Sequence, residues 1–390
     1  MDTNDRTEES ASPSAGIVNC GSPSSLKAIG NLAFLVLAAV LTLTTAAACV
    51  LPASQKTEEV VDEFDISGPV NLTIDIFAGS VELVGVDGAT NIQIAAEVHE
   101  PDRVKYKVAK KGNTVQVTAQ QKRRGLGIRR DKLIGKVDLR VRMPTQANME
   151  IRTNIGNIDA RQLIGESELR TIAGNISVAD SQGEFDLETE IGGISAHQIV
   201  GEFELRTTAG DISVADGQGE FTLETEIGGI SARQIVGEFE LRTTAGDISV
   251  ADGRGEFDME TEIGGISAHQ VVGEFELRTT AGDISVADGQ GEFTLETEIG
   301  GISFSGEFTD QSDNLFSTVT GDIEVALVEE PNVELQASTH LAGKIHLGQS
   351  VSKSISEMGI SGERRNLNMT MGIGTADLSL ETQSGNVRIE

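Results

Sequence analysis

The chain has 390 residues but no tryptophan, a single tyrosine and two cysteines. Two cysteines, Cys20 and Cys49, do not make a disulfide framework. Positive charge is also scarce, because 30 Lys and Arg residues stand against 61 Asp and Glu residues, a formal net charge of −31 at pH 7. Binding to nucleic-acid phosphates needs clustered lysine and arginine, so this balance argues against nucleic acid as a partner.

One long apolar stretch is present, and it carries no charge from Ile29 to Leu51. Lys27 precedes it, and three alanines (46–48) lead into Cys49. A positive flank, an apolar stretch and small residues at a cleavage position are the parts of a secretory signal. The layout resembles a bacterial lipoprotein signal, in which Cys49 becomes the lipidated first residue. About 20 apolar residues can also span a bilayer as an uncleaved helix. Both interpretations attach the chain to a membrane and place the rest on its extracytoplasmic side.

Glycine is abundant, with 44 residues, and it is periodic. The dipeptide Gly-Glu returns every 18 residues from Gly165 to Gly291, and a second glycine series keeps the same step from Gly156 to Gly300. A fixed period near twenty residues is typical of a repeat architecture. The 36-residue copies that begin at Gly201 and Gly237 differ at five positions, so the recent unit of duplication is two repeats.

Each repeat reads as strand, turn, strand. In EFELRTTAG (202–210), apolar or small residues alternate with charged or polar ones, which predicts a strand with one buried face. Gly210 and Asp211 suit a corner, ISV is a short second strand, and ADGQG closes the unit. Stacking such units about 4.8 Å apart predicts an all-β fold, a parallel β-solenoid (β-helix) with 18-residue coils.

Stacking turns equivalent positions into columns. At the 18-residue step we expect interior columns of phenylalanine (Phe185 to Phe293), leucine or methionine (Leu187 to Leu295), isoleucine (Ile176 to Ile302) and threonine (Thr153 to Thr297). One outward position alternates arginine and glutamate from Arg170 to Glu296, which sets opposite charges on neighbouring coils.

The pattern weakens outside the central coils, although alternating strands continue on both sides. We therefore divide the chain into a leader with a signal or anchor segment (1–48), the lipidation site and a tether (49–69), an irregular N-terminal β segment (70–146), the regular solenoid (147–305), and C-terminal coils with a cap (306–390). The irregular ends are expected to cap the open coils.

The stretch RMPTQANMEIRTNIGNIDARQLIGESELRTIAGNISV (142–178) has recurrent T-x-x-G-[DN]-I turns and G-E-[FS]-x-L returns. In these features the chain resembles the adhesin β-repeat family, a domain family of unknown function, over roughly residues 70–390. The resemblance implies an extracytoplasmic β-solenoid that is often membrane-anchored, with "adhesin" as a label and not a demonstrated activity.

Carboxylates on a β-solenoid raise the hypothesis of a polysaccharide-active enzyme. That chemistry needs one carboxylate pair in two different environments, whereas the Gly-Glu carboxylates are equivalent from Glu184 to Glu292. We therefore expect no enzymatic activity and no cofactor.

Cation binding is a second hypothesis, because oxygen-rich clusters suit Ca²⁺. The simpler interpretation is that these carboxylates are solvated and give solubility, and we likewise expect His197 and His269 to face outward without partners. The candidate ligands are Glu202, Glu220, Glu238, Glu256, Glu274, Asp216, Asp252 and Asp288.

The stretch QKRRGLGIRRDK (121–132) concentrates six positive charges. It reads as an exposed loop between strands. Through Arg123, Arg124, Arg129 and Arg130 it could instead contact anionic lipid headgroups, an acidic polymer or the acidic column of the protein itself.

The sequence thus predicts a non-enzymatic, membrane-anchored β-solenoid of the cell envelope. It would act as an adhesin-like or structural surface module, with a cell-surface polymer or protein as partner. A ligand-reading module of cell-envelope stress signalling is the alternative, and a polysaccharide-active enzyme is the third. The sequence leaves the oligomeric state open.

Overall fold

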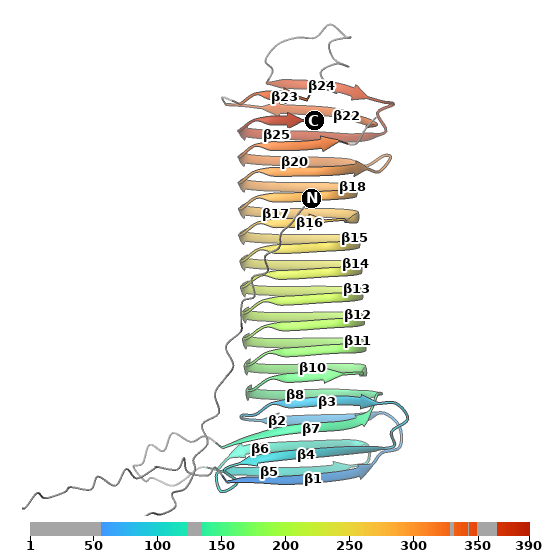
Figure 1. The fold of residues 1–390 in the computed structure, drawn as a ribbon, viewed down its shortest axis with the longest axis vertical. Coiled ribbons are helices and arrows are strands. Elements are labelled where there is room, and N and C mark those ends of the chain that lie inside the picture. The colour runs from blue at the N-terminus through green and yellow to red at the C-terminus, as the bar shows by residue number, and fades with distance from the viewer. Residues whose placement is uncertain (1–55, 123–134, 328–330, 342, 349–364) are drawn as a thin grey trace, which may run out of the picture. The chain divides into compact units, whose positions relative to one another are not determined.

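The computed structural model describes residues 56–122, 135–327, 331–341, 343–348 and 365–390. These residues form the strands β1 to β26 and no helix, joined in one hydrogen-bonded system (Figure 1). Within these ranges no helix has the length and apolarity to cross a bilayer. The apolar stretch from Ile29 to Leu51, with Cys49, lies outside the described residues.

The central coils form a straight stack that Figure 1 shows in green to orange. Neighbouring strands are parallel, and each residue pairs with the one 18 positions further on, as Phe185 does with Phe203 and Leu205 with Leu223. The predicted parallel β-solenoid with 18-residue coils is therefore confirmed. The strands of this part are β8 (Ala147–Ile155), β9 (Ile158–Arg161), β10 (Ile164–Ala173), β11 (Ile176–Ile191), β12 (Ile194–Ala209), β13 (Ile212–Ile227), β14 (Ile230–Ala245), β15 (Ile248–Ile263), β16 (Ile266–His269), β17 (Val272–Ala281), β18 (Ile284–Ile299) and β19 (Ile302–Phe308).

Each coil bends at two places. One is the glycine turn between strands, such as Gly210-Asp211 between β12 and β13. The other lies inside the long strands, where Asp216 (φ 54°) and Gly219 (φ 135°) leave the extended region. A Cβ atom at Gly219 would overlap the carbonyl oxygen of Gly201 on the preceding coil. This close approach explains why the glycine of Gly-Glu recurs in every coil.

The interior is built from columns of identical side chains. The phenylalanines from Phe185 to Phe293 stack with centroids 4.6 to 5.4 Å apart and planes within 13° of parallel. The leucine, isoleucine and threonine columns are buried as expected. From Thr171 to Thr297 each threonine hydroxyl donates to a glycine carbonyl 15 residues earlier, as Thr207 does to Gly192 at 2.9 Å, and Thr153 donates to the carbonyl of Gly79. The hydroxyl column therefore satisfies its own hydrogen bonds inside the core.

A second ladder links the glycine turns. The Asp211 carboxylate accepts a hydrogen bond of 2.8 Å from the backbone N–H of Gly229, one coil further on. Asp247 and Asp283 repeat this bond to Gly265 and Gly301. These aspartates hold adjacent turns in register, a role that the sequence pattern did not indicate.

The N-terminal end departs from the parallel pattern. β2 and β3 add one coil below β8 and β9, but β4 runs antiparallel to β7 and β1, and β5 runs antiparallel to β6. The stretch 49–69, expected as a tether, thus already contains a strand from Thr57 onward. The strands here are β1 (Thr57–Asp65), β2 (Val70–Ile76), β3 (Val81–Val86), β4 (Asn91–His99), β5 (Val104–Lys111), β6 (Thr114–Gln121) and β7 (Lys136–Pro144).

The C-terminal end does not follow chain order. β25 inserts between β20 and β22, and β26 inserts between β21 and β23. β24 then pairs antiparallel with β22 at the top of the stack (Figure 1). The strands are β20 (Asp313–Thr320), β21 (Ile323–Leu327), β22 (Val333–Thr339), β23 (Ile345–Leu347), β24 (Asn366–Met371), β25 (Ala376–Ser384) and β26 (Val387–Ile389).

The glycine corner gives a direct test of the stack. Gly219→Ala is expected to lower the free energy of unfolding by about 2 to 4 kcal/mol, because the Cβ meets backbone and φ is positive. Gly217→Ala is the matched control. A Cβ there meets the Phe221 ring at 3.1 Å, and the same position holds Ile199 and Ile235 in the neighbouring coils. Urea unfolding of both variants measures the difference, and equal losses would contradict the close-approach explanation.

Candidate functional site

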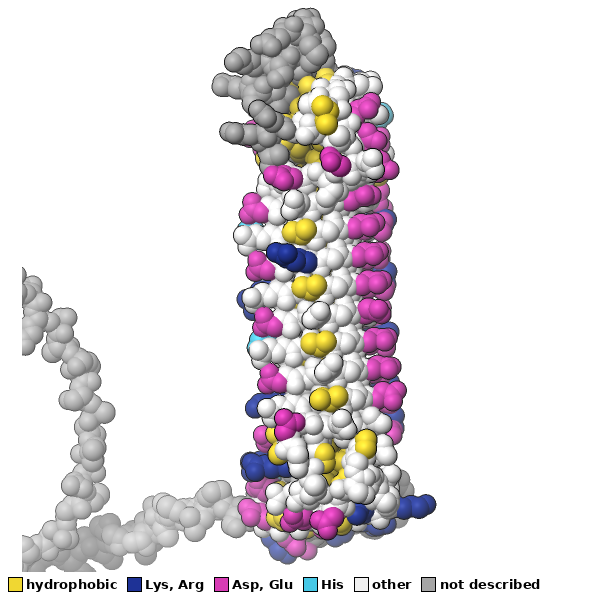
Figure 2. All heavy atoms as spheres, turned by 90° about the vertical axis from the view of Figure 1, so that its right-hand side faces the viewer, with side chains coloured by type: hydrophobic (Ala, Val, Ile, Leu, Met, Phe, Trp, Pro, Cys, Tyr) yellow, Lys and Arg dark blue, Asp and Glu magenta, His cyan; other side chains and the backbone are white. Residues whose placement is uncertain are grey.

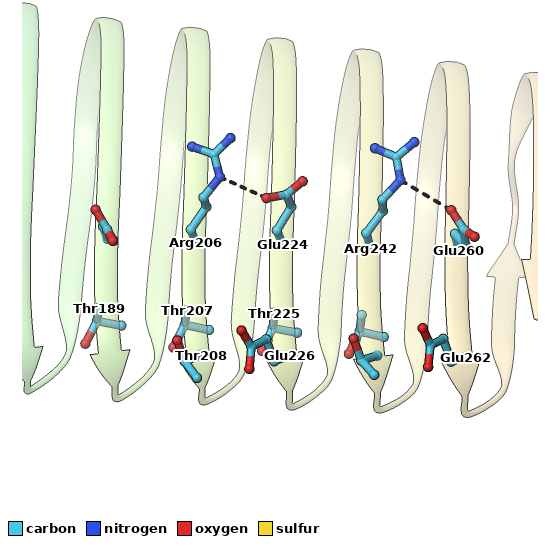
Figure 3. Close-up of a pocket in the computed structure, with 13 residues that line it drawn as sticks. Thr189, Arg206, Thr207, Thr208, Glu224, Thr225, Glu226, Arg242, Glu260 and Glu262 are labelled. Atoms are coloured by element: carbon cyan, nitrogen blue, oxygen red, sulfur yellow. Dashed lines mark hydrogen bonds and ion pairs between the residues drawn. The ribbon is translucent and has the colours of Figure 1, made fainter.

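An alternating row of arginine and glutamate runs along one broad face of the coils (Figure 3). Arg206 donates from Nε to Glu224 at 2.8 Å, and Arg242 repeats the bond to Glu260 at 3.4 Å. Each arginine also pairs with the glutamate two positions earlier on its own strand, as Arg206 does with Glu204. The predicted opposition of charges on neighbouring coils is thus confirmed. With the arginine side chains 40 to 44 % exposed, each pair is worth at most about 1 kcal/mol.

This row borders an open groove of about 420 Å³ that spans several coils. Its lining offers guanidinium, carboxylate and hydroxyl groups for hydrogen bonds, and the same set returns every second coil. The carboxylates of the groove occupy equivalent positions in alternate coils, as Glu224 and Glu260 do. The lining residues are Glu188, Thr189, Arg206, Thr207, Thr208, Glu224, Thr225, Glu226, Arg242, Thr243, Thr244, Glu260 and Glu262.

The narrow edge of the stack carries the candidate cation ligands. Figure 2 shows an unbroken acidic column along one border of this edge, an interrupted acidic column along the other, and single apolar side chains between them. The unbroken column is the Gly-Glu series, where register places Glu202 beside Glu220 and Glu220 beside Glu238. The apolar positions include Val200 and Val236, which are 42 % and 46 % exposed. The two acidic columns are therefore separated along the coil and do not converge.

The carboxylates of the unbroken column differ from those of the Arg–Glu row in their ion pairing. Over the described part of the chain, none of the glutamates at this position takes part in an ion pair. Across the same residues, no group of three or more His, Cys, Asp or Glu side chains lies close enough to hold a metal ion. The structure thus does not bring Glu202, Glu220, Glu238, Glu256 and Glu274 together with Asp216, Asp252 and Asp288.

The interrupted column includes two histidine–aspartate contacts. His197 Nδ1 lies 3.1 Å from an Asp216 carboxylate oxygen on the next coil, and His269 Nε2 lies 3.7 Å from Asp288. The expectation that these histidines lack partners is therefore wrong. Sequence separation concealed the contact, because the partners are 19 residues apart and meet only when the coils stack.

Two predicted sites cannot be placed. Cys49 lies outside the described residues, and so do Arg123, Arg124, Arg129 and Arg130. Lipidation of the cysteine and an anionic partner for the arginines remain predictions.

A polar cluster that the sequence did not reveal lies at the N-terminal end. Asp138 on β7 accepts hydrogen bonds from the Ser80 backbone N–H at 2.9 Å, the Ser80 hydroxyl at 3.1 Å and Lys136 Nζ at 2.7 Å. His99 Nε2 lies 3.0 Å from Asp138 Oδ2, the oxygen that also accepts from Lys136, and His99 Nδ1 lies 3.3 Å from the Thr57 hydroxyl. Burial opposes ionisation of Asp138, but the hydrogen bonds from Lys136 and Ser80 outweigh it and hold its pKa below the usual value.

This cluster has the hydroxyl–imidazole–carboxylate order of a nucleophilic site, but its contacts indicate a structural role. The Asp138 carboxylate is already shared by Ser80, Lys136 and His99, and Thr57 lies exposed on the edge strand β1. The chain of contacts joins β1, β4 and β7 across 81 positions of sequence, from Thr57 to Asp138. We therefore interpret the cluster as a side-chain tie that supplements the antiparallel pairing of β1 with β4.

The unpaired glutamate column predicts a measurable salt effect. Glu220→Gln with Glu256→Gln is expected to raise the thermal midpoint at low ionic strength, because it removes like-charge contacts worth about 0.2 to 1 kcal/mol each. The matched control, Glu224→Gln with Glu260→Gln, removes the same charge from ion-paired positions and is expected to lower it. At 1 M NaCl screening should shrink both effects, since the Debye length falls to about 3 Å. Equal shifts for the two variants would contradict the assignment.

The depressed pKa of Asp138 predicts a pH-dependent contribution to stability. Above the unfolded-state pKa of about 3.9 the stabilising contribution of the ionised carboxylate is fully present, and it is lost as the pH falls below that value and through the lower pKa of the folded state. Asp138→Asn should therefore cost roughly 1 to 3 kcal/mol at pH 7 and progressively less below pH ~4. Urea unfolding of both proteins across this range measures it. A difference independent of pH would show that the charge is not involved.

Comparison with solved structures identifies three chains whose descriptions concern adhesion. A "putative cell adhesion protein" from Clostridium sporogenes is 10% identical, with 86% of this chain and 99% of that chain covered and a TM-score of 0.17. A "putative adhesin" from Bacteroides fragilis is 11% identical, with coverages of 85% and 97% and a TM-score of 0.23. Another, from Parabacteroides distasonis, is 12% identical, with coverages of 70% and 97% and a TM-score of 0.27.

No curated protein gives a significant sequence match. The family model described as Toastrack DUF4097 matches residues 71–272 and 236–390. The two matches overlap within the coils and together span the stack from β2 to the C-terminal strand. The chain therefore belongs to the Toastrack DUF4097 family.

Proposed function

We propose that the protein is a non-enzymatic, membrane-anchored structural or adhesin-like module of the cell envelope, facing the extracytoplasmic side. The observation that carries the proposal is the uniformity of the coil surface. The Arg–Glu row and the glutamate column each repeat without a unique member, from β11 to β18.

A uniform coil surface favours one contact that is repeated in many coils. It does not favour a reaction at a single site. A catalytic pair needs two carboxylates in different environments, which identical coils do not supply. Repeated weak contacts instead add up through effective concentration, so a surface of modest individual bonds can hold a polymeric partner firmly. The groove beside Arg206 and Arg242 offers such bonds at a spacing of two coils, about 10 Å.

Anchoring is proposed from the sequence. The apolar stretch ends at Leu51, and the first described residue is Lys56, next to β1. With Cys49 as the attachment point, seven residues separate the anchor from the stack, which at full extension is at most about 25 Å. Such a short tether suits a rod held near the membrane at its N-terminal end.

Removal of one two-coil unit tests the proposal. Deleting residues 237–272 joins Val236 to Gly273 and preserves every column in register. We expect a folded protein whose long dimension, measured by small-angle scattering, is shorter by about 10 Å. If the repeated coils retain cells on a surface, the number of cells retained should fall stepwise as successive two-coil units are deleted.

The matched control deletes one coil. Removal of residues 219–236 places Arg242 directly beside Arg206, so like charges meet in the row and alternation is lost. This variant should melt at a lower temperature than the larger deletion, although it removes half as many residues. Unchanged retention after the first two-coil deletion would indicate a contact elsewhere, and abolished retention would indicate a single contact within the deleted unit. Either result would contradict a multivalent surface.

A further inference from the structure

The N-terminal end of the stack carries a basic strand on an acidic protein. β5 reads VKYKVAKK, with four lysines in eight residues, and Lys105, Lys107, Lys110 and Lys111 are all exposed. The whole chain has 30 basic residues and a net charge of −31. The four lysines therefore give β5 a positive charge within a strongly negative chain.

These lysines are not used inside the protein. Throughout the described chain, none of the four forms an ion pair or a side-chain hydrogen bond, whereas Arg170, Arg206, Arg242 and Arg278 on the coils each pair with two or more carboxylates. Unpaired cations beside abundant carboxylates do not serve internal stability. Their charge is free for an external anionic partner.

β5 is also an end strand. Its recorded pairing is with β6, and Figure 1 shows it at the foot of the stack next to β1. Its inner residues Tyr106 and Val108 pack against the core, and burial together with the nearby charge of Asp62 on β1 raises the pKa of the Tyr106 hydroxyl. The inner face thus fixes the strand, and the lysines project from the rim of this end.

We propose that β5 lies on the anionic headgroups of the membrane that holds the protein, a contact that rests on the anchoring proposed above. The seven-residue tether lets this end reach the headgroups, while the other end of the stack stays tens of Å away. Each lysine is attracted to an anionic surface when it lies within a Debye length of that surface. β1 pairs with β4, whereas β5 pairs with β6, and β1 bears the acidic residues Glu58, Glu59, Asp62, Glu63 and Asp65. The contact therefore tilts the rod toward its β5 side.

A second copy of the chain is the competing occupant, because the glutamate column is also complementary to β5. The bilayer is favoured by position: the apolar stretch ends five residues before Lys56, so an anchored chain brings β5 to the surface whatever its concentration. A second copy would bring a net charge of −31 against an equally acidic protein. The two occupants differ in their dependence on lipid and on protein concentration.

Hydrogen–deuterium exchange of the full chain on vesicles tests the contact. The vesicles consist of phosphatidylcholine alone or of phosphatidylcholine with phosphatidylglycerol, and the peptide followed spans 104–111. Exchange is expected to be slower on the anionic vesicles than on the neutral ones. The difference should be lost in Lys105→Gln/Lys107→Gln/Lys110→Gln/Lys111→Gln and in high salt. It should persist when all four lysines are replaced by arginine.

Two further variants separate the explanations. Arg233→Gln with Arg254→Gln removes exposed positive charges from the coils and should leave the difference intact. Cys49→Ala tests the lipid anchor by sedimentation with neutral vesicles, so loss of anchoring is scored apart from loss of the β5 contact. Equal exchange on both vesicle types in the bound protein overturns the proposal. If exchange of this peptide is slow without vesicles and slows further as the protein concentration rises, β5 contacts a second copy and the proposal is overturned.

Discussion

The whole structure depends on one constraint: equivalent residues of successive coils must share a column at the spacing of hydrogen-bonded strands. At that distance the glycine of each Gly-Glu step presses on the carbonyl of the glycine below it, and no side chain fits between them. The same spacing places the phenylalanine rings within 4.6 to 5.4 Å of one another. Each residue type must therefore fit its position in one coil and also pack against the same residue in the adjacent coils.

Charged residues meet this constraint in two ways. In the Arg–Glu row the sequence alternates sign, so the period of the surface is two coils while the period of the backbone is one. In the Gly-Glu column the sign never changes, and the carboxylates stay exposed to solvent and salt. The 36-residue duplication preserves both arrangements, whereas an 18-residue duplication would place arginine beside arginine. Electrostatics between coils thus explains why the recent unit of duplication is a pair.

Wherever the period held, the sequence predicted the structure. Strand direction, coil length and the Phe, Leu and Thr columns follow from residues 18 apart, because the repeat itself encodes the contacts. Outside the coils the contacts join segments with no shared pattern. The tie from Thr57 through His99 to Asp138, the insertion of β25 between β20 and β22, and the free lysines of β5 all depend on tertiary pairing. Alternation within a strand predicts its buried face but not its neighbour.

The two ends of the stack therefore differ from each other, whereas the central coils are nearly the same. Identical coils give length, rigidity and repeated bonds, but they cannot distinguish one direction along the axis by any single site. The N-terminal end does so by charge, with an acidic β1 paired to β4 and a basic β5 paired to β6. A rod whose one end is electrostatically distinct has a defined orientation at a charged surface. Duplication of coils in pairs lengthens the stack without changing this end.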